Sequence, residues 1–159
     1  IFASRGQLDA SVFLGGSYKN VRPDLKLKTD RWYHVAMVYE GDSLTLYVDG
    51  KPEVQLPTKS SMKRKVNGLP FIVGADPDGR GRANSFFNGE IDEIRISRGA
   101  RYSKPFEPKR RLTSDQDTVI FLDCDQIVGP FLIDRGPQGH YFRLTGDAHL
   151  TEVKEEANQ

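Results

Sequence analysis

The chain is poor in cysteine, tryptophan and methionine, with one, one and two of them in 159 residues. Because Cys124 stands alone, the sequence excludes an internal disulfide and a thiolate metal site. An excess of one charge is also lacking, since 23 lysines and arginines balance 22 acids to give a net charge of +1. A nearly neutral chain creates no field that attracts polyanions, so we do not expect nucleic acid as a partner.

Long hydrophobic runs are absent as well, and none approaches the roughly 18 residues that a membrane span needs. We therefore expect no direct membrane insertion. Basic clusters at residues 63–65 and 109–111 lie beside Ser, Pro or Gly and lack interleaved aromatics, which indicates solvated loops. His34, His140 and His149 show no zinc-ligand spacing, and we expect His34 to pack inside the fold.

The length suits one domain, for which roughly 100 to 200 residues are usual. We predict a single domain over residues 1–153 and a frayed tail over residues 154–159. The chain opens on Ile1 without an initiator methionine or a signal segment, so we interpret it as a piece of a longer polypeptide.

Short apolar segments between turn signals predict an all-β antiparallel sandwich. Trp32 to Tyr39 is apolar or aromatic nearly throughout, which predicts a strand covered on both faces, with Trp32 in the core. Residues 44–48 alternate and predict one core face and one half-wet face. Asp49-Gly50 predicts a two-residue hairpin turn. Further strands are expected at residues 11–14, 25–28, 54–56, 70–74 and 118–124 and within 129–144 and 147–153.

Three stretches in order resemble one known family. They are "RWYHVAMVYEGDSLTLYVDGK", "FIVGADPDG" and "FFNGEIDEIRISRGARY". Together they resemble the laminin-G-like, concanavalin A-like superfamily, in particular its bacterial modules attached to larger proteins. The resemblance implies a two-sheet antiparallel jelly-roll sandwich with ligand contacts on the concave face or the rim loops. It also implies that the first strands of the domain precede Ile1.

The trailing segment, residues 117–144, resembles the part that often leads such a module, so it either closes the same sandwich or starts a second copy. We favour the first, because too few residues remain for another domain.

Glycoside hydrolases of this architecture carry catalytic acids on one strand as Glu-x-Asp-x-Glu or Glu-x-Asp-x-x-Glu. Glu90 and Asp92 fit the first two positions, but the third is Ile94, or Arg95 in the longer spacing. Glu93 would point away from both acids in a regular strand, toward solvent. A slip in the apolar phase suggests a bulge near Asp92 or Glu93, which leaves the orientation of Glu93 open.

Calcium is the cofactor that the resemblance suggests, because related modules often hold it at the rim. Asp76 and Asp78 in the Gly- and Asp-rich loop over residues 74–85 are the predicted metal ligands, with Asn84 as a further oxygen. Two arginines in the same loop oppose a cation there, and a plain Asp/Gly turn is the alternative. Asp123 and Asp125 form a second candidate pair.

We therefore predict a noncatalytic module that binds carbohydrate or a protein surface for a larger, exported protein, in an extracellular, cell-surface or periplasmic setting. One alternative is a glycoside hydrolase using Glu90 and Asp92, and another is a structural spacer or assembly domain. The predicted ligand-binding residues are five charged or amide side chains of the loop over residues 74–85 and two rings that could stack on a ligand: Asp76, Asp78, Arg80, Arg82, Asn84, Tyr47 and Tyr102.

Overall fold

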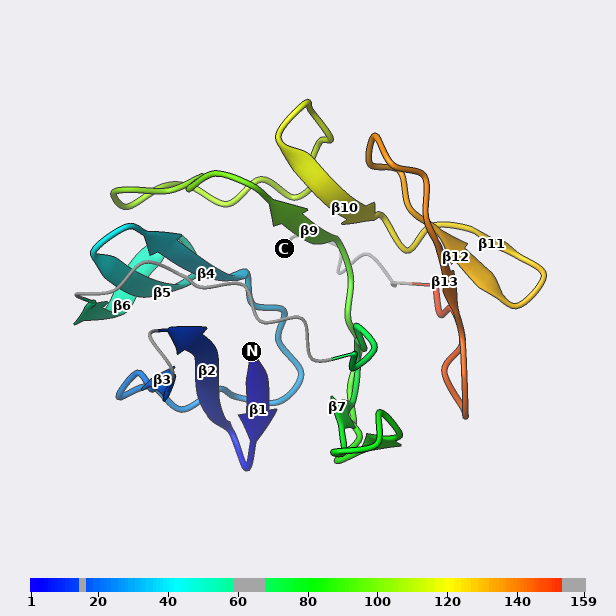
Figure 1. The fold of residues 1–159 in the computed structure, drawn as a ribbon, viewed down its shortest axis with the longest axis horizontal. Helices are drawn as coiled ribbons and strands as arrows, with labels where there is room; N and C mark the ends of the chain where they lie inside the picture. Colours follow the sequence, from blue (N-terminus) through cyan, green and yellow to red (C-terminus); the bar gives the residue numbers. More distant parts are fainter. Residues whose placement is uncertain (15–16, 59–67, 153–159) are drawn as a thin grey trace. The chain divides into compact units, whose positions relative to one another are not determined.

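The computed structural model describes residues 1–14, 17–58 and 68–152 (Figure 1). Every regular element in these residues is a β-strand, and the strands pair antiparallel. The predicted all-β class is therefore confirmed. This part of the chain has no helix with the length and hydropathy to cross a bilayer.

The chain divides into two compact units. Unit 1 comprises Ile1–Gly89 and Gly99–Lys109, and unit 2 comprises Glu90–Arg98 and Arg110–Gln159. The single domain over residues 1–153 stays a prediction. The basic cluster at residues 63–65 and the predicted frayed tail over residues 154–159 lie outside the described residues.

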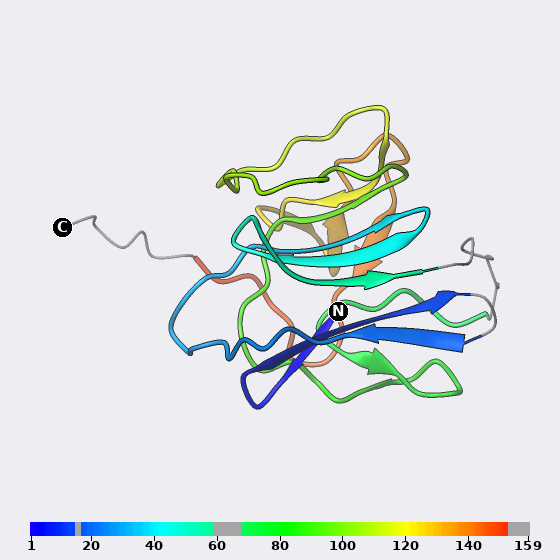
Figure 2. The same ribbon diagram turned by 90° about the vertical axis from the view of Figure 1, so that its left-hand side faces the viewer.

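Unit 1 contains two three-stranded sheets that lie one above the other (Figure 2). Their strands are β1 Phe2–Ser4, β2 Gln7–Leu14 and β3 Ser17–Val21 in one sheet, and β4 Val35–Glu40, β5 Ser43–Val48 and β6 Lys51–Pro57 in the other. Buried side chains of both sheets form one cluster, made of Leu8, Ala10, Val21, Leu44, Leu46 and Val48. Each fully buried Leu or Val contributes about 1.5–3 kcal/mol relative to an exposed position, so this cluster is the main stabilising element of unit 1.

Strand β5 is buried on both faces, which corrects the predicted half-wet face. Thr45 and Tyr47 point away from the cluster but are only 7% and 3% exposed. The cause is a segment far along the chain, Gly99–Lys109, which we call the strap. Its rings at Tyr102 and Phe106 pack against Tyr47. Alternation within β5 gives no signal of this distant cover.

Strand β4 begins later than predicted, and the predicted core position of Trp32 is wrong. Trp32 is 48% exposed. Asp30 has a φ of +58°, so the chain turns just before this stretch. The guanidinium of Arg31 lies 4.4 Å from the ring centre of Tyr33, and the Tyr33 hydroxyl accepts a hydrogen bond from Lys28 N. Residues 31–33 are thus held as a surface segment ahead of the strand.

Three other predicted strands do not form. Residues 25–28 make only one isolated bridge, between Lys26 and Gln7, and residues 70–74 and 147–152 have no strand. Near the first of these the Gln7 side chain donates to Pro23 O at 2.8 Å and to Leu25 O at 3.5 Å. Side-chain bonds of this kind take the place of a backbone ladder.

The predicted hairpin turn between β5 and β6 is confirmed. Asp49 and Gly50 have φ values of +48° and +74°, as the type I′ turn requires. Gly50 has a second role, because a Cβ atom there would lie 1.8 Å from the carbonyl oxygen of Phe106. Phe106 N donates to Gly50 O at 3.0 Å, so the turn is also the docking point of the strap.

Unit 2 contains two small sheets. Their strands are β9 Ile94–Ser97 paired with β10 Thr118–Leu122, and β11 Ile127–Val128, β12 Phe131–Ile133 and β13 Tyr141–Arg143 in the order β11-β12-β13. The predicted strand over residues 118–124 ends at Leu122, and Cys124 has a φ of +56°. Burial raises the pKa of the Cys124 thiol to about 11, so the thiol stays protonated at neutral pH.

Candidate functional site

The Gly- and Asp-rich loop of unit 1 folds as a short hairpin, built from β7 Asp76–Pro77 and β8 Ala83–Asn84. Asp76 lies directly opposite Asn84 in this pair. Asp78 N donates to Arg82 O at 2.8 Å, and Gly81 N donates to Asp78 O at 2.9 Å. The predicted loop over residues 74–85 thus contains two short strands, and five of the predicted ligand residues lie in this hairpin.

Asp78 is the structural centre of this turn. Its Oδ1 accepts hydrogen bonds from Arg80 N at 2.8 Å and Arg82 N at 2.9 Å, and its Oδ2 accepts one from Arg82 Nε at 2.9 Å. The two backbone hydrogen bonds, with that of Arg82 first, lower the pKa of the Asp78 carboxyl below its usual value. Asp78 is therefore ionised at neutral pH, with both oxygens engaged.

These bonds bear on the predicted calcium site. A calcium ion needs about 6–8 oxygen ligands, and at Asp78 it would compete with the guanidinium of Arg82. The part of the chain that the structure describes holds no group of three or more His, Cys, Asp and Glu side chains placed to bind a metal ion. Calcium binding by Asp76 and Asp78 stays a prediction, now with a named competitor.

The two predicted stacking rings lie on the strap and the sheet beneath it. Tyr102 and Phe106 stack with ring centres 3.6 Å apart and an angle of 5° between the rings. Tyr47 is buried against both rings, and its hydroxyl donates to Tyr102 O at 3.4 Å. Burial, and then the charge of Glu40, raise the pKa of Tyr47. The predicted role of Tyr47 as a stacking platform is therefore wrong, because the buried ring has no face open to a ligand.

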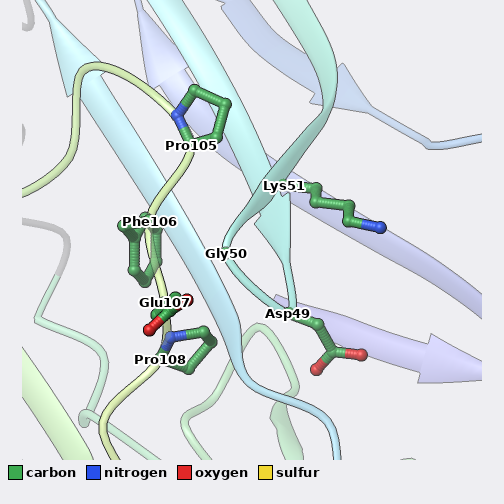
Figure 3. A pocket seen from close by; sticks show the side chains of 7 residues that line it. All are labelled: Asp49, Gly50, Lys51, Pro105, Phe106, Glu107 and Pro108. Carbon is green, nitrogen blue, oxygen red and sulfur yellow. The ribbon is translucent and has the colours of Figure 1, made fainter.

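Where the strap meets the β5–β6 turn, the surface has an open depression of about 450 Å³ (Figure 3). It is lined by Asp49, Gly50, Lys51, Pro105, Phe106, Glu107 and Pro108. One of its two acids, Asp49, is already engaged, because its Oδ2 accepts a hydrogen bond from Arg31 Nη2 at 2.7 Å and its Oδ1 accepts one from His34 N at 3.0 Å. Its wall is mainly apolar, and the strap residues Pro105, Phe106 and Pro108 form one side of it.

The acids around residue 90 lie in unit 2, ahead of β9 and outside regular strand structure. Glu93 has a φ of +53°, which explains the slip in the apolar phase that suggested a bulge. The predicted solvent-facing orientation of Glu93 is wrong, because only 11% of its side chain is exposed. It accepts hydrogen bonds from Arg111 Nη1, at 3.2 Å, and from Leu112 N.

The other two acids have local partners. Asp92 Oδ1 accepts a hydrogen bond from Glu93 N at 2.9 Å, and Glu90 Oε1 accepts one from the Thr151 hydroxyl at 3.3 Å. Burial raises the pKa of Asp92, and the bond from Glu93 N only partly opposes this effect. Glu90, Asp92 and Glu93 thus have three different sets of partners.

Asp123 and Asp125, the second predicted pair of metal ligands, are each bound by a different arginine. Asp123 Oδ2 accepts from Arg135 Nε at 3.2 Å, and Asp125 Oδ1 accepts from Arg111 Nη1 at 3.0 Å. Arg111 therefore bridges Asp125 and Glu93. Sequence reasoning treated residues 109–111 as a solvated basic loop and missed this role, because nothing in the local pattern marks a cation that pairs with acids 14 and 18 residues away.

Sequence reasoning also missed a buried carboxylate in unit 2. The Asp134 side chain is 0% exposed, and it accepts from Phe121 N at 2.8 Å, Gly136 N at 2.7 Å and His140 Nδ1 at 2.8 Å. The spacing Asp-x-Gly-x-x-Gly-His was the available signal. Burial alone would raise the pKa of Asp134, but these hydrogen bonds, the one from Phe121 N first among them, outweigh burial and lower it.

One of three comparisons with known proteins finds a match. A family model described as the concanavalin A-like lectin/glucanases superfamily matches residues 2–104. No curated protein and no solved structure matches the chain.

Proposed function

The chain belongs to the concanavalin A-like lectin/glucanases superfamily, and from that premise we propose that it is a noncatalytic recognition module for carbohydrate or a protein surface. The superfamily includes both lectins and glucanases, so membership alone leaves binding and cleavage open. The state of the carboxylates ahead of β9 supports the first of these.

Retaining glycoside hydrolysis needs two carboxyl groups about 5–5.5 Å apart, one as nucleophile and one as acid/base. The third acid of the family pattern is replaced here by Ile94 or Arg95. Glu93, the remaining acid nearby, is bound by Arg111 and by Leu112 N, and is mostly buried. Both carboxylate oxygens of Glu93 thus have partners within the protein, and this is the observation that carries the proposal.

A glycoside hydrolase using Glu90 and Asp92 is the second candidate. It is favoured by the raised pKa of Asp92, because burial shifts the pKa of that carboxyl in the direction that a general acid needs. Such an enzyme would lose turnover on Glu90→Gln, whereas a recognition module has no turnover to lose. A structural spacer without a soluble ligand is the third candidate.

We place the ligand contacts on the hairpin of β7 and β8, where Arg80, Arg82 and Asn84 accompany Asp76 and Asp78, with Tyr102 as a further contact. A glycan array run with and without calcium tests this placement. Binding that falls on Arg80→Ala and Asn84→Ala, and persists on Asp147→Ala in unit 2, is the expected result. Absence of binding under both conditions would favour the spacer.

We also propose that the module acts as an accessory part of a larger protein outside the cytoplasm. This rests on the family alone. Fractionation of cells that express the full-length protein tests it, and recovery in the cytoplasm alone would contradict it.

A further inference from the structure

The three-stranded sheet of unit 2 has one face of unusual composition. Directly paired residues share a face, and every second residue along a strand returns to it. The register pairs Val128 with Phe131, Phe131 with Arg143, and Ile133 with Tyr141. These five side chains therefore lie on one side of the sheet, which we call the aromatic face.

Two ring contacts agree with this assignment. Phe131 and Tyr141 meet edge to face with ring centres 6.3 Å apart on the aromatic face, while His140 and Phe142 meet at 6.4 Å on the other side. Tyr141 is nevertheless 68% exposed and Val128 58% exposed. Tyr141 is thus an exposed ring whose orientation is already fixed by Phe131, which reduces the entropy lost when a partner covers it.

Arg143 gives the aromatic face a charge. Among the described residues, ion pairs with acids are formed by Arg22, Arg31, Arg82, Arg111 and Arg135, and none of these ion pairs includes Arg143. A guanidinium covered by a partner without a counter-ion would carry a large desolvation cost. The face is therefore complementary to a partner that supplies a carboxylate at this point.

The composition distinguishes between possible occupants. A carbohydrate needs several hydrogen-bonding groups, and the aromatic face offers only the Tyr141 hydroxyl and the Arg143 guanidinium among apolar side chains. A second copy docked by the same face would supply no acid to either Arg143, because none of the five side chains of the face is acidic. Tyr, Phe and Arg are the side chains enriched where proteins anchor to proteins.

As a refinement that rests on the recognition role above, we propose that the aromatic face docks an apolar segment of a partner protein, with a carboxylate of that segment against Arg143. Tyr141 and Phe131 provide the apolar anchor, and Arg143 sets the charge preference of the partner.

Selection from a phage-displayed random peptide library tests this directly. Wild-type protein should enrich apolar peptides that contain Asp or Glu, and Arg143→Glu protein should enrich Lys or Arg at the same peptide positions. Tyr141→Ser should weaken the selected wild-type peptides by about tenfold or more. Tyr18→Ser is the matched control, because Tyr18 is also 68% exposed and held edge to face by Phe13, at 5.3 Å, but lies in unit 1.

Circular dichroism of each variant verifies that it folds. The proposal is overturned if no peptide is enriched, if enrichment ignores the charge at residue 143, or if Tyr18→Ser weakens the peptides as much as Tyr141→Ser. It is also overturned if Tyr141→Ser abolishes glycan binding without affecting peptides, because the face is then a sugar platform. Turnover of a glycan would contradict the noncatalytic role and leave the peptide result to stand separately.

Discussion

Gly41 and Gly50 of unit 1 have similar backbone angles but different surroundings. Gly50 and Gly41 have φ values of +74° and +60°. A Cβ atom at Gly50 would meet the Phe106 carbonyl, whereas one at Gly41 would meet nothing within 4 Å. Both positions need the left-handed backbone, but only Gly50 must also remain without a side chain so that the strap can dock.

Gly50→Ala should therefore cost more than its backbone strain. We expect Gly41→Ala to lower the free energy of unfolding by about 1 kcal/mol, and Gly50→Ala to lower it by roughly 3 kcal/mol, because the strap must move. Urea denaturation of the two variants measures the difference. Equal losses would mean that the contact of Gly50 with the strap has no energetic weight.

Asp134 makes the stability of unit 2 depend on pH. Because hydrogen bonds lower the pKa of its carboxyl in the folded state, its contribution is fully present above the unfolded value, about 3.9. The contribution is lost as the pH falls through the folded pKa. Asp134→Asn should lower the free energy of unfolding by about 2–4 kcal/mol at neutral pH. The variant should also lose less stability than the wild type when the pH is lowered, because the titrating carboxyl is absent.

Thermal melts followed by circular dichroism from neutral pH to below about pH 4 measure this effect. Asp147→Asn is a suitable control, because Asp147 is exposed and engages His149 only through its backbone carbonyl. If Asp134→Asn and Asp147→Asn melt alike across the range, the buried carboxylate does not stabilise the fold.

At the scale of the elements, local sequence signals identified a strand and a turn whose contacts are with residues nearby in the chain. Alternation in residues 44–48 and the Asp49-Gly50 pair predicted β5 and its turn. The burial of Tyr47 depends on a strap more than 50 residues away, at Tyr102. Glu93 likewise depends on Arg111. No periodicity encodes such pairings, so β5 and its turn were predictable and the environments of the site residues were not.

The hairpin of β7 and β8 allows a test of the calcium prediction at the scale of one element. If the loop binds calcium, Arg82→Ala should strengthen binding, because it removes the guanidinium from Asp78 Oδ2. Stabilisation reaches about 1.4 kcal/mol when the calcium concentration is roughly ten times Kd. Melting temperatures with and without calcium are the measurement.

Arg80→Ala is the matched control for that experiment, since Arg80 contacts Asp78 through its backbone nitrogen. A calcium-induced rise in melting temperature that is larger for Arg82→Ala than for Arg80→Ala supports the site. No rise in the wild type or in either variant would rule out calcium at this loop.

For the whole molecule, the family and the all-β class were both accessible from the ordered motifs, because turn residues and strand alternation are local properties. The function proposed here depends instead on what surrounds three acids. Glu90 contacts Thr151, Asp92 contacts the next backbone nitrogen, and Glu93 contacts Arg111. These contacts support the proposal that the protein binds a partner without cleaving it.

Release of reducing ends from soluble β-glucans is the most direct measurement of that claim, made in parallel for the wild type and Glu90→Gln. We predict that neither protein releases reducing ends above the buffer blank. Turnover by the wild type that Glu90→Gln abolishes would contradict the account and identify the acids ahead of β9 as catalytic.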